Sequence, residues 1–485
     1  MFGKSKLARG SSRRKPAGFV ALRGVHRGAG SGRPLLVRSA AQAKRSFPDG
    51  HGPATGPAAR RLPLLLGLAI SIATPAAATR EDDLRSRADA ALDAWRMDEV
   101  IAALPLLPDD VETDYIRGIA ANRSNHVKRS ERLLSHALIG LERTRPDRAA
   151  RALLVLADDY RKSSSYAAQA RALERLITRH ADRLAPEVLA GARTDLALSS
   201  ALKDAPPQTI RSSGPVTLPI RRNPVGTLDV DVIAEGVTGP WMLDSGANYS
   251  IVSESFAKRL KLEAAGSITG VGSITGIDVD SRVAIVKELR LGSITVRNVA
   301  VLVVRDELLH VKLPTTEYQI DAALGFPVFQ ALGKVTIRGD ATITAAPRSA
   351  PLVDGATMYM NELTPVLALT TQGRSLPFTL DTGANSTDLW HAYWETVGDD
   401  ASSWPHRTRR SSGLGGAKTF DIVLQPELRL LVGNDVVILK DVPIEAGDQH
   451  GAGDQPMFGN IGQDLWRNAA GFTMDLRSMR FRLEH

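Results

Sequence analysis

The chain has 485 residues, enough for roughly two to four domains, and its 43% hydrophobic and 24% charged residues exclude a fibrous or wholly disordered protein. It contains no cysteine, which excludes a disulfide scaffold, thiolate metal sites and a cysteine nucleophile. The formal charge is +8, but the first 61 residues hold fourteen Lys or Arg and one acid, Asp49, so the remainder carries −5. We therefore expect no nucleic-acid binding by the folded body.

Residues 1–59 are rich in Arg, Gly, Ser and Pro without a sustained apolar period, which predicts a basic disordered leader. Residues 60–78 read as a secretory signal peptide: two arginines, an apolar run at 62–73 and three final alanines. This run is too short for a transmembrane helix, which needs about 20 residues. Either translation starts further in or the leader is unusually long, and a buried helix is the alternative. We expect export, to the periplasm or the medium, of a mature chain without a transmembrane segment.

Residues 79–205 have a helical pattern, with apolar residues such as Leu134, Leu138 and Leu141 spaced three or four apart. Breaks fall at 105–108, 145–146 and 163–165. The pattern favours stacked antiparallel helices similar to tetratricopeptide repeats (TPR), which would bind a protein partner. A plain helical bundle is the alternative.

The residue pattern changes from helical to strand-like after a linker at 204–215 that is rich in Pro, Ser and Gly. The segments 227–233, 283–289 and 294–304 alternate or are rich in β-branched residues, with Gly and Asp between them. This pattern predicts all-β structure to the end of the chain.

The β-region contains an internal duplication. Residues 242–248 (Met-Leu-Asp-Ser-Gly-Ala-Asn) match residues 379–385 (Thr-Leu-Asp-Thr-Gly-Ala-Asn) at an offset of 137. Residues 323–329 (Ala-Leu-Gly-Phe-Pro-Val-Phe) match 460–466 (Asn-Ile-Gly-Gln-Asp-Leu-Trp) at the same offset. Between these anchors, two Gly-x-Gly turns match at an offset of 143. Three ordered matches indicate a real repeat, with one half at 206–348 and the other at 349–485.

Each copy delivers an aspartate from a strand into a tight turn, where glycine permits close approach of the backbone. Two such turns facing each other place the Asp244 and Asp381 carboxylates within hydrogen-bonding distance, where like charges share one proton. One carboxyl then acts as general base on a water while the other donates to a carbonyl oxygen. This chemistry needs no cofactor, and the ten histidines lack the spacing of a zinc site. We therefore predict no cofactor and no metal site.

The two Leu-Asp-Ser/Thr-Gly-Ala motifs, each followed by an apolar-apolar-Gly segment, resemble the retropepsin-type aspartic proteases. The resemblance covers about 270 residues from Gly214 onward. It implies two β-lobes that hydrolyse peptide bonds of a polypeptide substrate, with Asp244 and Asp381 as the catalytic pair. The implied supporting residues are Ser245, Gly246, Thr382 and Gly383, and the implied flap residues are Gly270, Gly272, Gly413 and Gly415.

Together with the helical pattern of residues 79–205, the resemblance predicts a multidomain protein in which an all-α, TPR-like region precedes two all-β retropepsin-like lobes that form a pseudo-dimer. Retroviral members supply one motif per chain, whereas this chain holds both, so we expect a monomeric pseudo-dimer, with a homodimer as the alternative. Asn248 and Asn385 stand where retroviral members often have aspartate, and Phe326 and Gln463 stand where they have a charged residue. The functional prediction is an aspartic endopeptidase, and the alternative is a non-catalytic peptide- or protein-binding scaffold that keeps the protease fold.

Overall fold

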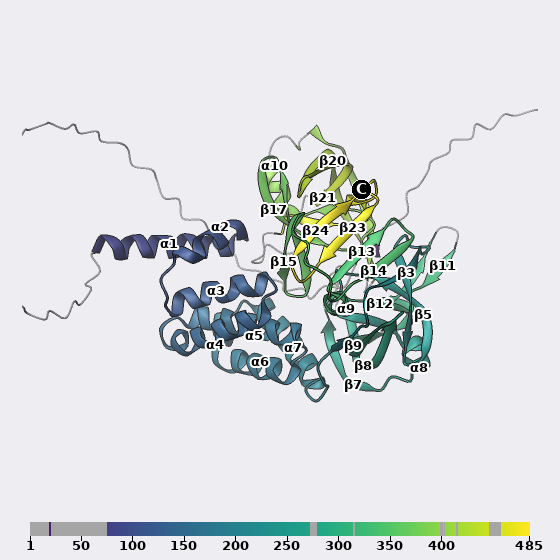
Figure 1. Ribbon diagram of the computed structural model, residues 1–485, viewed down its shortest axis with the longest axis horizontal. Coiled ribbons are helices and arrows are strands. Elements are labelled where there is room, and N and C mark those ends of the chain that lie inside the picture. The colour runs from purple at the N-terminus through teal and green to yellow at the C-terminus, as the bar shows by residue number, and fades with distance from the viewer. Residues whose placement is uncertain are drawn as a thin grey trace, which may run out of the picture.

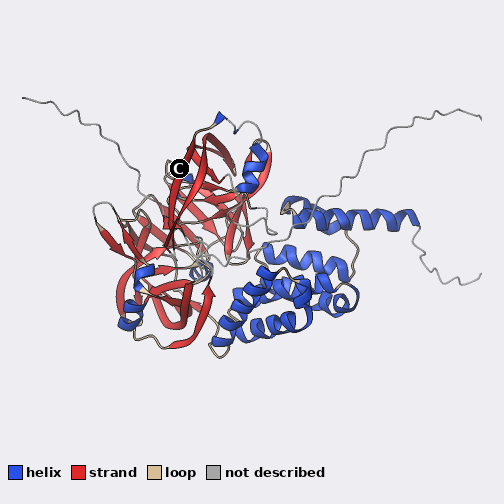
Figure 2. Cartoon of the chain, turned by 180° about the vertical axis from the view of Figure 1, so that it is seen from behind, coloured by secondary structure: helices blue, strands red, loops and turns tan. Residues whose placement is uncertain are grey.

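The computed structural model describes residues 19–20, 75–271, 279–313, 316–397, 401, 403–413, 416–445 and 457–485. A helical region at 75–201 is followed by a β-rich region from residue 209 onward, and the two lie side by side (Figures 1 and 2). The predicted order of an α-region and a β-region is confirmed. The predicted leader and signal peptide lie outside the described residues, except for β1 (Phe19–Val20) and the start of α1 (Pro75–Asp93).

The helical region consists of helices that pack in chain order, each against the next. After α1 they are α2 (Met97–Ala103), α3 (Val111–Arg123), α4 (Val127–Thr144), α5 (Pro146–Lys162), α6 (Tyr166–His180) and α7 (Pro186–Ala201), with 3₁₀ turns at Leu104–Leu106 and Ala181–Arg183. The predicted breaks at 105–108 and 163–165 fall between α-helices, and the break at 145–146 falls at the junction of α4 and α5, where Pro146 is the first residue of α5.

Three turns between helices have the same form. Trp95, Asn125 and Ser164 have φ angles of 56°, 59° and 54°, and the following residue donates its N–H to the carbonyl five residues back. This Schellman arrangement satisfies the last carbonyls of a helix and redirects the chain. The pairs α1–α2, α3–α4 and α5–α6 are therefore three helical hairpins with a common turn.

The first half of the β-region places one short strand between two longer ones. β12 pairs in parallel with β5 and antiparallel with β6, while β4 and β5 form an antiparallel hairpin. β2 lies inside the predicted linker, where its β-branched residues extend the sheet by pairing with β9. The elements are β2 (Thr209–Arg211), β3 (Val216–Arg222), β4 (Leu228–Ala234), β5 (Val237–Leu243), β6 (Ser250–Ser253), α8 (Glu254–Arg259), β7 (Ala264–Val271), β8 (Val279–Leu291), β9 (Ile294–Val304), β10 (His310–Lys312), β11 (Glu317–Gln319), β12 (Ala322–Leu324), α9 (Phe326–Leu332), β13 (Lys334–Arg338) and β14 (Thr342–Ala345).

The second half repeats these pairings. β22 pairs in parallel with β17 and antiparallel with β18, and β16 and β17 form the hairpin. The paired residues correspond at the offset of 137: Ala323 is opposite Met242, and Asn460 is opposite Thr379. The elements are β15 (Ala356–Asn361), β16 (Thr364–Thr371), β17 (Arg374–Leu380), β18 (Asp388–Leu389), α10 (His391–Val397), β19 (His406–Gly413), β20 (Gly416–Val432), β21 (Asp435–Glu445), β22 (Gly459–Ile461), a 3₁₀ turn (Gln463–Leu465), β23 (Gly471–Asp475) and β24 (Arg480–Glu484).

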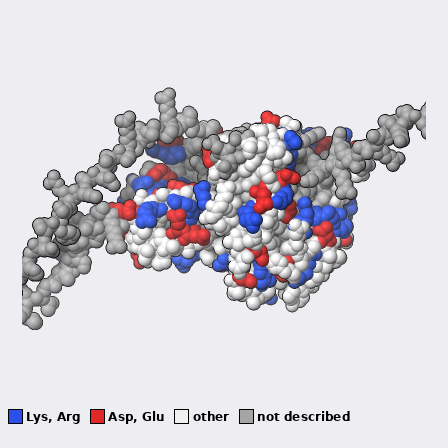
Figure 3. Space-filling model, turned by 90° about the horizontal axis from the view of Figure 1, so that it is seen from above, with Lys and Arg blue, Asp and Glu red and all other residues white. Residues whose placement is uncertain are grey.

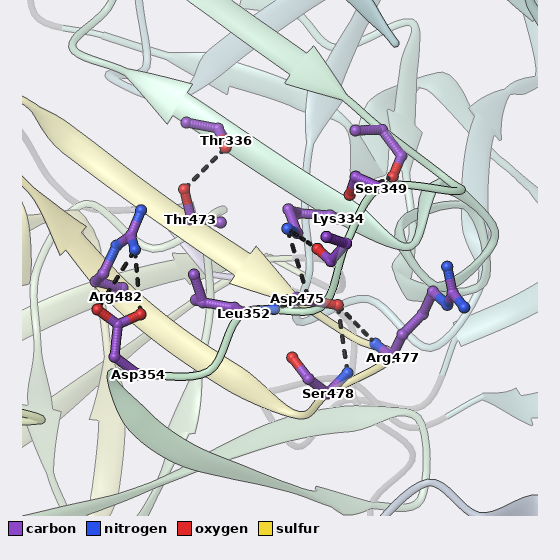
Figure 4. Close-up of polar contacts among 12 residues, drawn as sticks. Lys334, Thr336, Ser349, Leu352, Asp354, Thr473, Asp475, Arg477, Ser478 and Arg482 are labelled. Atoms are coloured by element: carbon purple, nitrogen blue, oxygen red, sulfur yellow. Dashed lines mark hydrogen bonds and ion pairs between the residues drawn. The ribbon is translucent and has the colours of Figure 1, made fainter. Parts of the chain in front are cut away.

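One sheet joins the two halves, with the strand order β3–β14–β13–β23–β24–β15 and three strands from each half. At its centre Thr336 is opposite Thr473, its own equivalent at the offset of 137. Their hydroxyl oxygens are 2.8 Å apart (Figure 4). The pairing of β13 with β23 stays the same when each residue is replaced by its equivalent at the offset of 137. The two strands are therefore related by a local twofold axis at the Thr336–Thr473 pair.

Apolar packing connects all parts of the described chain. One buried cluster runs through both halves of the β-region. A second joins the helices to Tyr359, Val366 and Trp390 of the second half. A third joins Tyr166 and Leu198 to the first half. The helical region therefore shares buried apolar surface with both halves.

The surface carries charges of both signs. On the face shown in Figure 3, Lys and Arg side chains are intermingled with Asp and Glu side chains instead of forming one basic area. Among the described helices, none combines the length and the apolar character needed to cross a membrane.

Candidate active site

Two matching loops carry the aspartates. β5 ends at Leu243 and β17 ends at Leu380, so each aspartate is the first residue after its strand. The Asp244 N–H donates to the Leu324 carbonyl of β12 at 3.1 Å, and the Asp381 N–H donates to the Ile461 carbonyl of β22 at 2.9 Å. Because β12 and β22 also pair with the strands that leave the loops, both ends of each loop are fixed.

The glycine that ends each apolar-apolar-Gly segment, Gly325 or Gly462, is required because a larger residue would clash with the backbone. A Cβ on Gly325 would lie 2.4 Å from the backbone carbon of Tyr249, and one on Gly462 would lie 2.5 Å from that of Ser386. Real Cβ atoms do not approach backbone so closely, so each position needs glycine for the aspartate loop to pass. Tyr249 and Ser386 are themselves equivalent at the offset of 137.

The two loops are bonded to each other by their hydroxyl residues. The Thr382 hydroxyl accepts the Ser245 N–H at 2.9 Å, and the Ser245 hydroxyl accepts the Thr382 N–H at 3.1 Å. Each hydroxyl also donates to a backbone carbonyl of the opposite strand, Ser245 to Leu380 at 3.3 Å and Thr382 to Leu243 at 3.1 Å. All four bonds are buried, so the relative position of the loops is closely defined.

The carboxyl groups of Asp244 and Asp381 meet beside Gly383. A Cβ on Gly383 would lie 2.9 Å from Cγ of Asp244 and 3.1 Å from Oδ1 of Asp381, so glycine is required for both carboxyls to fit. Each residue is 1% exposed, so the two carboxyls adjoin the same glycine in a buried site. Burial, and next the charge of Asp381, raise the pKa of Asp244 well above its usual range. Such a pair can hold one proton between two carboxyls over a range of pH.

Amide N–H groups orient both carboxylates. Oδ1 of Asp244 accepts the backbone N–H groups of Gly246 at 3.1 Å and Ala247 at 3.0 Å. Oδ1 of Asp381 accepts the Gly383 N–H at 2.7 Å, and its Oδ2 accepts Nδ2 of Asn460 at 3.4 Å. The structure thus places Asp244, Asp381 and the supporting residues Ser245, Gly246, Thr382 and Gly383 in one cluster. Their catalytic roles remain predictions.

The asparagines after each motif make neutral contacts between the halves. Oδ1 of Asn248 accepts the Thr364 hydroxyl at 3.3 Å, and Nδ2 of Asn385 donates to the Val225 carbonyl at 2.7 Å. Gln463 contacts both halves: its Nε2 donates to the Thr382 carbonyl at 2.9 Å, and its Oε1 accepts from the Arg222 guanidinium of the first half at 2.8 Å. The two asparagines therefore make uncharged contacts between the halves, whereas Gln463 receives a charged donor.

The predicted flap residues belong to two hairpins. Gly270 lies near the end of β7, which pairs with β8, and Gly413 ends β19, which pairs with β20. Gly272 and Gly415 lie outside the described residues. Whether either hairpin covers a substrate stays a prediction.

The sequence analysis did not identify two polar groups that the structure shows. Asn460 and Thr379 form a buried polar pair beside Asp381. An alignment of the two repeats would have revealed this pair, because the equivalent residues of the first half, Ala323 and Met242, are apolar. The second is Arg161 of α5, whose guanidinium contacts Glu362 at 2.7 Å. No local pattern signals that pair, because its members are 201 residues apart. Within the described residues, no group of three or more His, Asp or Glu side chains is arranged to hold a metal ion.

Comparison with known proteins gives partial matches, to a family model and to solved structures. Residues 230–328 match a family model described as aspartyl protease. Among solved structures, the chain is similar to a retropepsin-like aspartic protease from Rickettsia conorii, with 15% identity over 29% of this chain and 95% of that chain and a TM-score of 0.20. No curated protein sequence matches the chain. The segment similar to aspartyl proteases contains Asp244 and the first loop, whereas Asp381 lies beyond it.

Proposed function

We propose that the chain is an exported aspartic endopeptidase whose two retropepsin-like lobes form a pseudo-dimer around Asp244 and Asp381. The observation that carries the proposal is that two buried carboxyls meet beside Gly383, on loops joined by matching hydroxyl-to-amide bonds. The aspartyl protease match over residues 230–328 supports the same chemistry for the first lobe. The equal pairing registers of the two halves support a site made within one chain.

The reaction follows from one proton shared by two carboxyls. The ionised carboxyl takes a proton from water as the water oxygen attacks the carbon of the peptide carbonyl, and the protonated carboxyl donates to the carbonyl oxygen. A tetrahedral diol results. Proton transfer to the amide nitrogen then allows the carbon–nitrogen bond to break, which releases an amine and a carboxylic acid and restores the shared proton.

In this proposal the helical region is a TPR-like domain that binds a protein partner. Its three hairpins with a common turn support the predicted TPR-like character, and such stacks offer surfaces for protein partners. Its shared apolar clusters support a fixed position beside both lobes. Export rests on the apolar run at 62–73 and its flanks.

The test is peptide cleavage by the full chain from acid to neutral pH, with fragments identified by mass spectrometry. Asp244→Asn and Asp381→Asn should each lower the rate by about 10²–10⁴-fold or more, because each removes a proton-transfer group. Asp231→Asn is the matched control, since this acid is exposed and pairs with Arg221 on the surface. Cleavage that survives both dyad variants would refute the proposal, and a folded wild type that cleaves nothing would favour the binding scaffold.

Mixing the two inactive variants tests the pseudo-dimer. A dyad within one chain leaves the mixture inactive, because each molecule lacks one carboxyl. A dyad formed between chains restores activity in part of the mixed dimers. Light-scattering mass measured at the same concentration checks the result, and recovery of activity in a dimer would overturn the monomeric arrangement.

A further inference from the structure

The two halves of the candidate site differ most at one pair of positions. In the second half Asn460 is opposite Thr379 in the parallel pairing of β22 and β17. In the first half the equivalent residues are Ala323 and Met242, opposite each other in β12 and β5. All four are buried. The same backbone therefore carries a polar pair beside one aspartate and an apolar pair in the equivalent place beside the other.

The polar pair has a defined orientation. The Thr379 hydroxyl donates to Oδ1 of Asn460 at 2.7 Å and also lies 3.2 Å from the Gly459 carbonyl. With Oδ1 engaged, Nδ2 of Asn460 is directed at Oδ2 of Asp381, 3.4 Å away. In the rotated amide, the Asn460 oxygen would face Oδ2 of Asp381, which would bring two acceptors together. The bond from Thr379 thus favours the orientation in which Asn460 presents a donor to Asp381.

A donor on a carboxylate stabilises the ionised form. Asp244 accepts two backbone N–H groups and Asp381 accepts the N–H of Gly383, and the charge of Asp381 acts on Asp244. The Asn460 amide is a side-chain donor, whereas the equivalent residues beside Asp244, Ala323 and Met242, have no side-chain donor. It reaches the second oxygen of Asp381, while both backbone donors of Asp244 use one oxygen.

We propose that Asn460, oriented by Thr379, makes the pair asymmetric, so that Asp381 is the ionised member and Asp244 keeps the shared proton. Resting on the proposed function, this assigns the two roles: Asp381 takes the proton from water, and Asp244 donates to the carbonyl oxygen of the peptide. Asn460 and Thr379 are positioning residues, because they act through Asp381.

The first test is the pH profile of kcat/KM in the full chain. Asn460→Leu removes the donor at similar size, so Asp381 ionises at higher pH and the acid limb moves up by about one pH unit. Activity on the acid side then falls about tenfold, with little change at the optimum. Thr379→Val should move the limb in the same direction by less. An unmoved acid limb in both variants would overturn the proposal.

The matched control transfers the polar pair to the first half. The double variant Met242→Thr, Ala323→Asn exchanges a large and a small residue for a small and a larger one, so the total volume changes little. It gives Asp244 an equivalent donor and should move the acid limb to lower pH, opposite to Asn460→Leu. Thr336→Val, at the centre of the joining sheet, removes a half-buried hydroxyl that lies outside both aspartate loops and should leave the limb in place. Movement of the same sign in the double variant would contradict the assignment.

A second readout does not depend on peptide cleavage. Carbon-13 NMR of labelled aspartate carboxyls follows ionisation in the full chain, with signals assigned by Asp244→Asn and Asp381→Asn. We expect the Asp381 signal to remain that of a carboxylate at pH values where Asp244 is protonated. The reverse order would overturn the asymmetry even in an active enzyme. Absence of cleavage with the expected order would refute the proposed function and leave the asymmetry standing.

Discussion

The two halves of the β-region share the strand pairings around their aspartate loops and differ in other elements and in many side chains. In each half the aspartate donates its N–H to a carbonyl of the equivalent strand, β12 or β22, and glycine is required at position 325 or 462. The differences are at equivalent positions: Ala323 against Asn460, Val225 against Glu362, and Arg338 against Asp475. The repeat therefore determines the geometry of the site, and the residues that break the repeat determine its chemistry and its contacts.

Glu362 shows what one such difference does. Its first-half equivalent, Val225, offers a backbone carbonyl to Asn385, whereas Glu362 forms an ion pair with Arg161 of the helical region. Arg161 also contacts Asp158 at 3.1 Å and Asp195 at 3.5 Å, and its side chain is 5% exposed. The helical region is thus tied by charge to the second half.

The largest expected effect is that of Arg161→Met. It leaves Asp158, Asp195 and Glu362 without the guanidinium they share, and removing one partner of a buried ion pair costs about 3–5 kcal/mol. The free energy of unfolding from urea titration measures the loss. The control is Arg221→Met, which breaks an exposed pair with Asp231 and should cost less than about 1 kcal/mol. Equal losses in the two variants would mean that the buried ion pairs contribute no more to the free energy of unfolding than the exposed pair.

Gly325→Ala and Gly462→Ala test whether the halves are equivalent in backbone. Each added Cβ would meet backbone atoms at 2.4 and 2.5 Å, so we expect both to lose about 3 kcal/mol. The urea midpoint measures each loss, and Gly214→Ala is the control, because no atom lies within 4 Å of a Cβ at that position. A small loss in one half alone would show that the loops differ in packing.

The smallest expected effect concerns Asp475, which replaces the first-half Arg338. Burial raises the pKa of Asp475, but N–H donors from Leu352, Arg477 and Ser478 outweigh it and hold the pKa below its usual value (Figure 4). A carboxyl with a lowered folded-state pKa stabilises above its unfolded pKa of about 3.9, and this stability is lost as pH falls through the folded pKa.

Asp475→Asn should therefore cost about 1–2 kcal/mol at neutral pH, and the difference from wild type should shrink below about pH 4. Urea titrations at several pH values measure it. Asp354→Asn is the control, because that acid lies two residues after Leu352, the residue whose N–H binds Asp475, and pairs with Arg482 while more than half exposed. A difference that grows toward acid pH would contradict the assigned direction.

The repeated motif made much of the site predictable. An offset of 137 in the sequence located both aspartates, their hydroxyl neighbours and the glycines at 325 and 462. The turns at Trp95 and Asn125 were not predicted, because they contain neither Pro nor Gly and their left-handed backbone is stabilised by Schellman hydrogen bonds. The strand β2 was not predicted, because its three residues lie within a segment whose Pro, Ser and Gly content is typical of a linker.

By itself, the sequence determined the order of a helical and a β-region, the duplication, and the residue types at each turn. These depend on local periodicity and on spacing, which neighbouring residues express directly. The tertiary structure alone decided that Asn460 faces Asp381, that Arg161 meets Glu362, and that Thr336 lies opposite Thr473. Such contacts join residues 79 to 201 positions apart, and strand pairing and packing, which no local pattern encodes, bring them together.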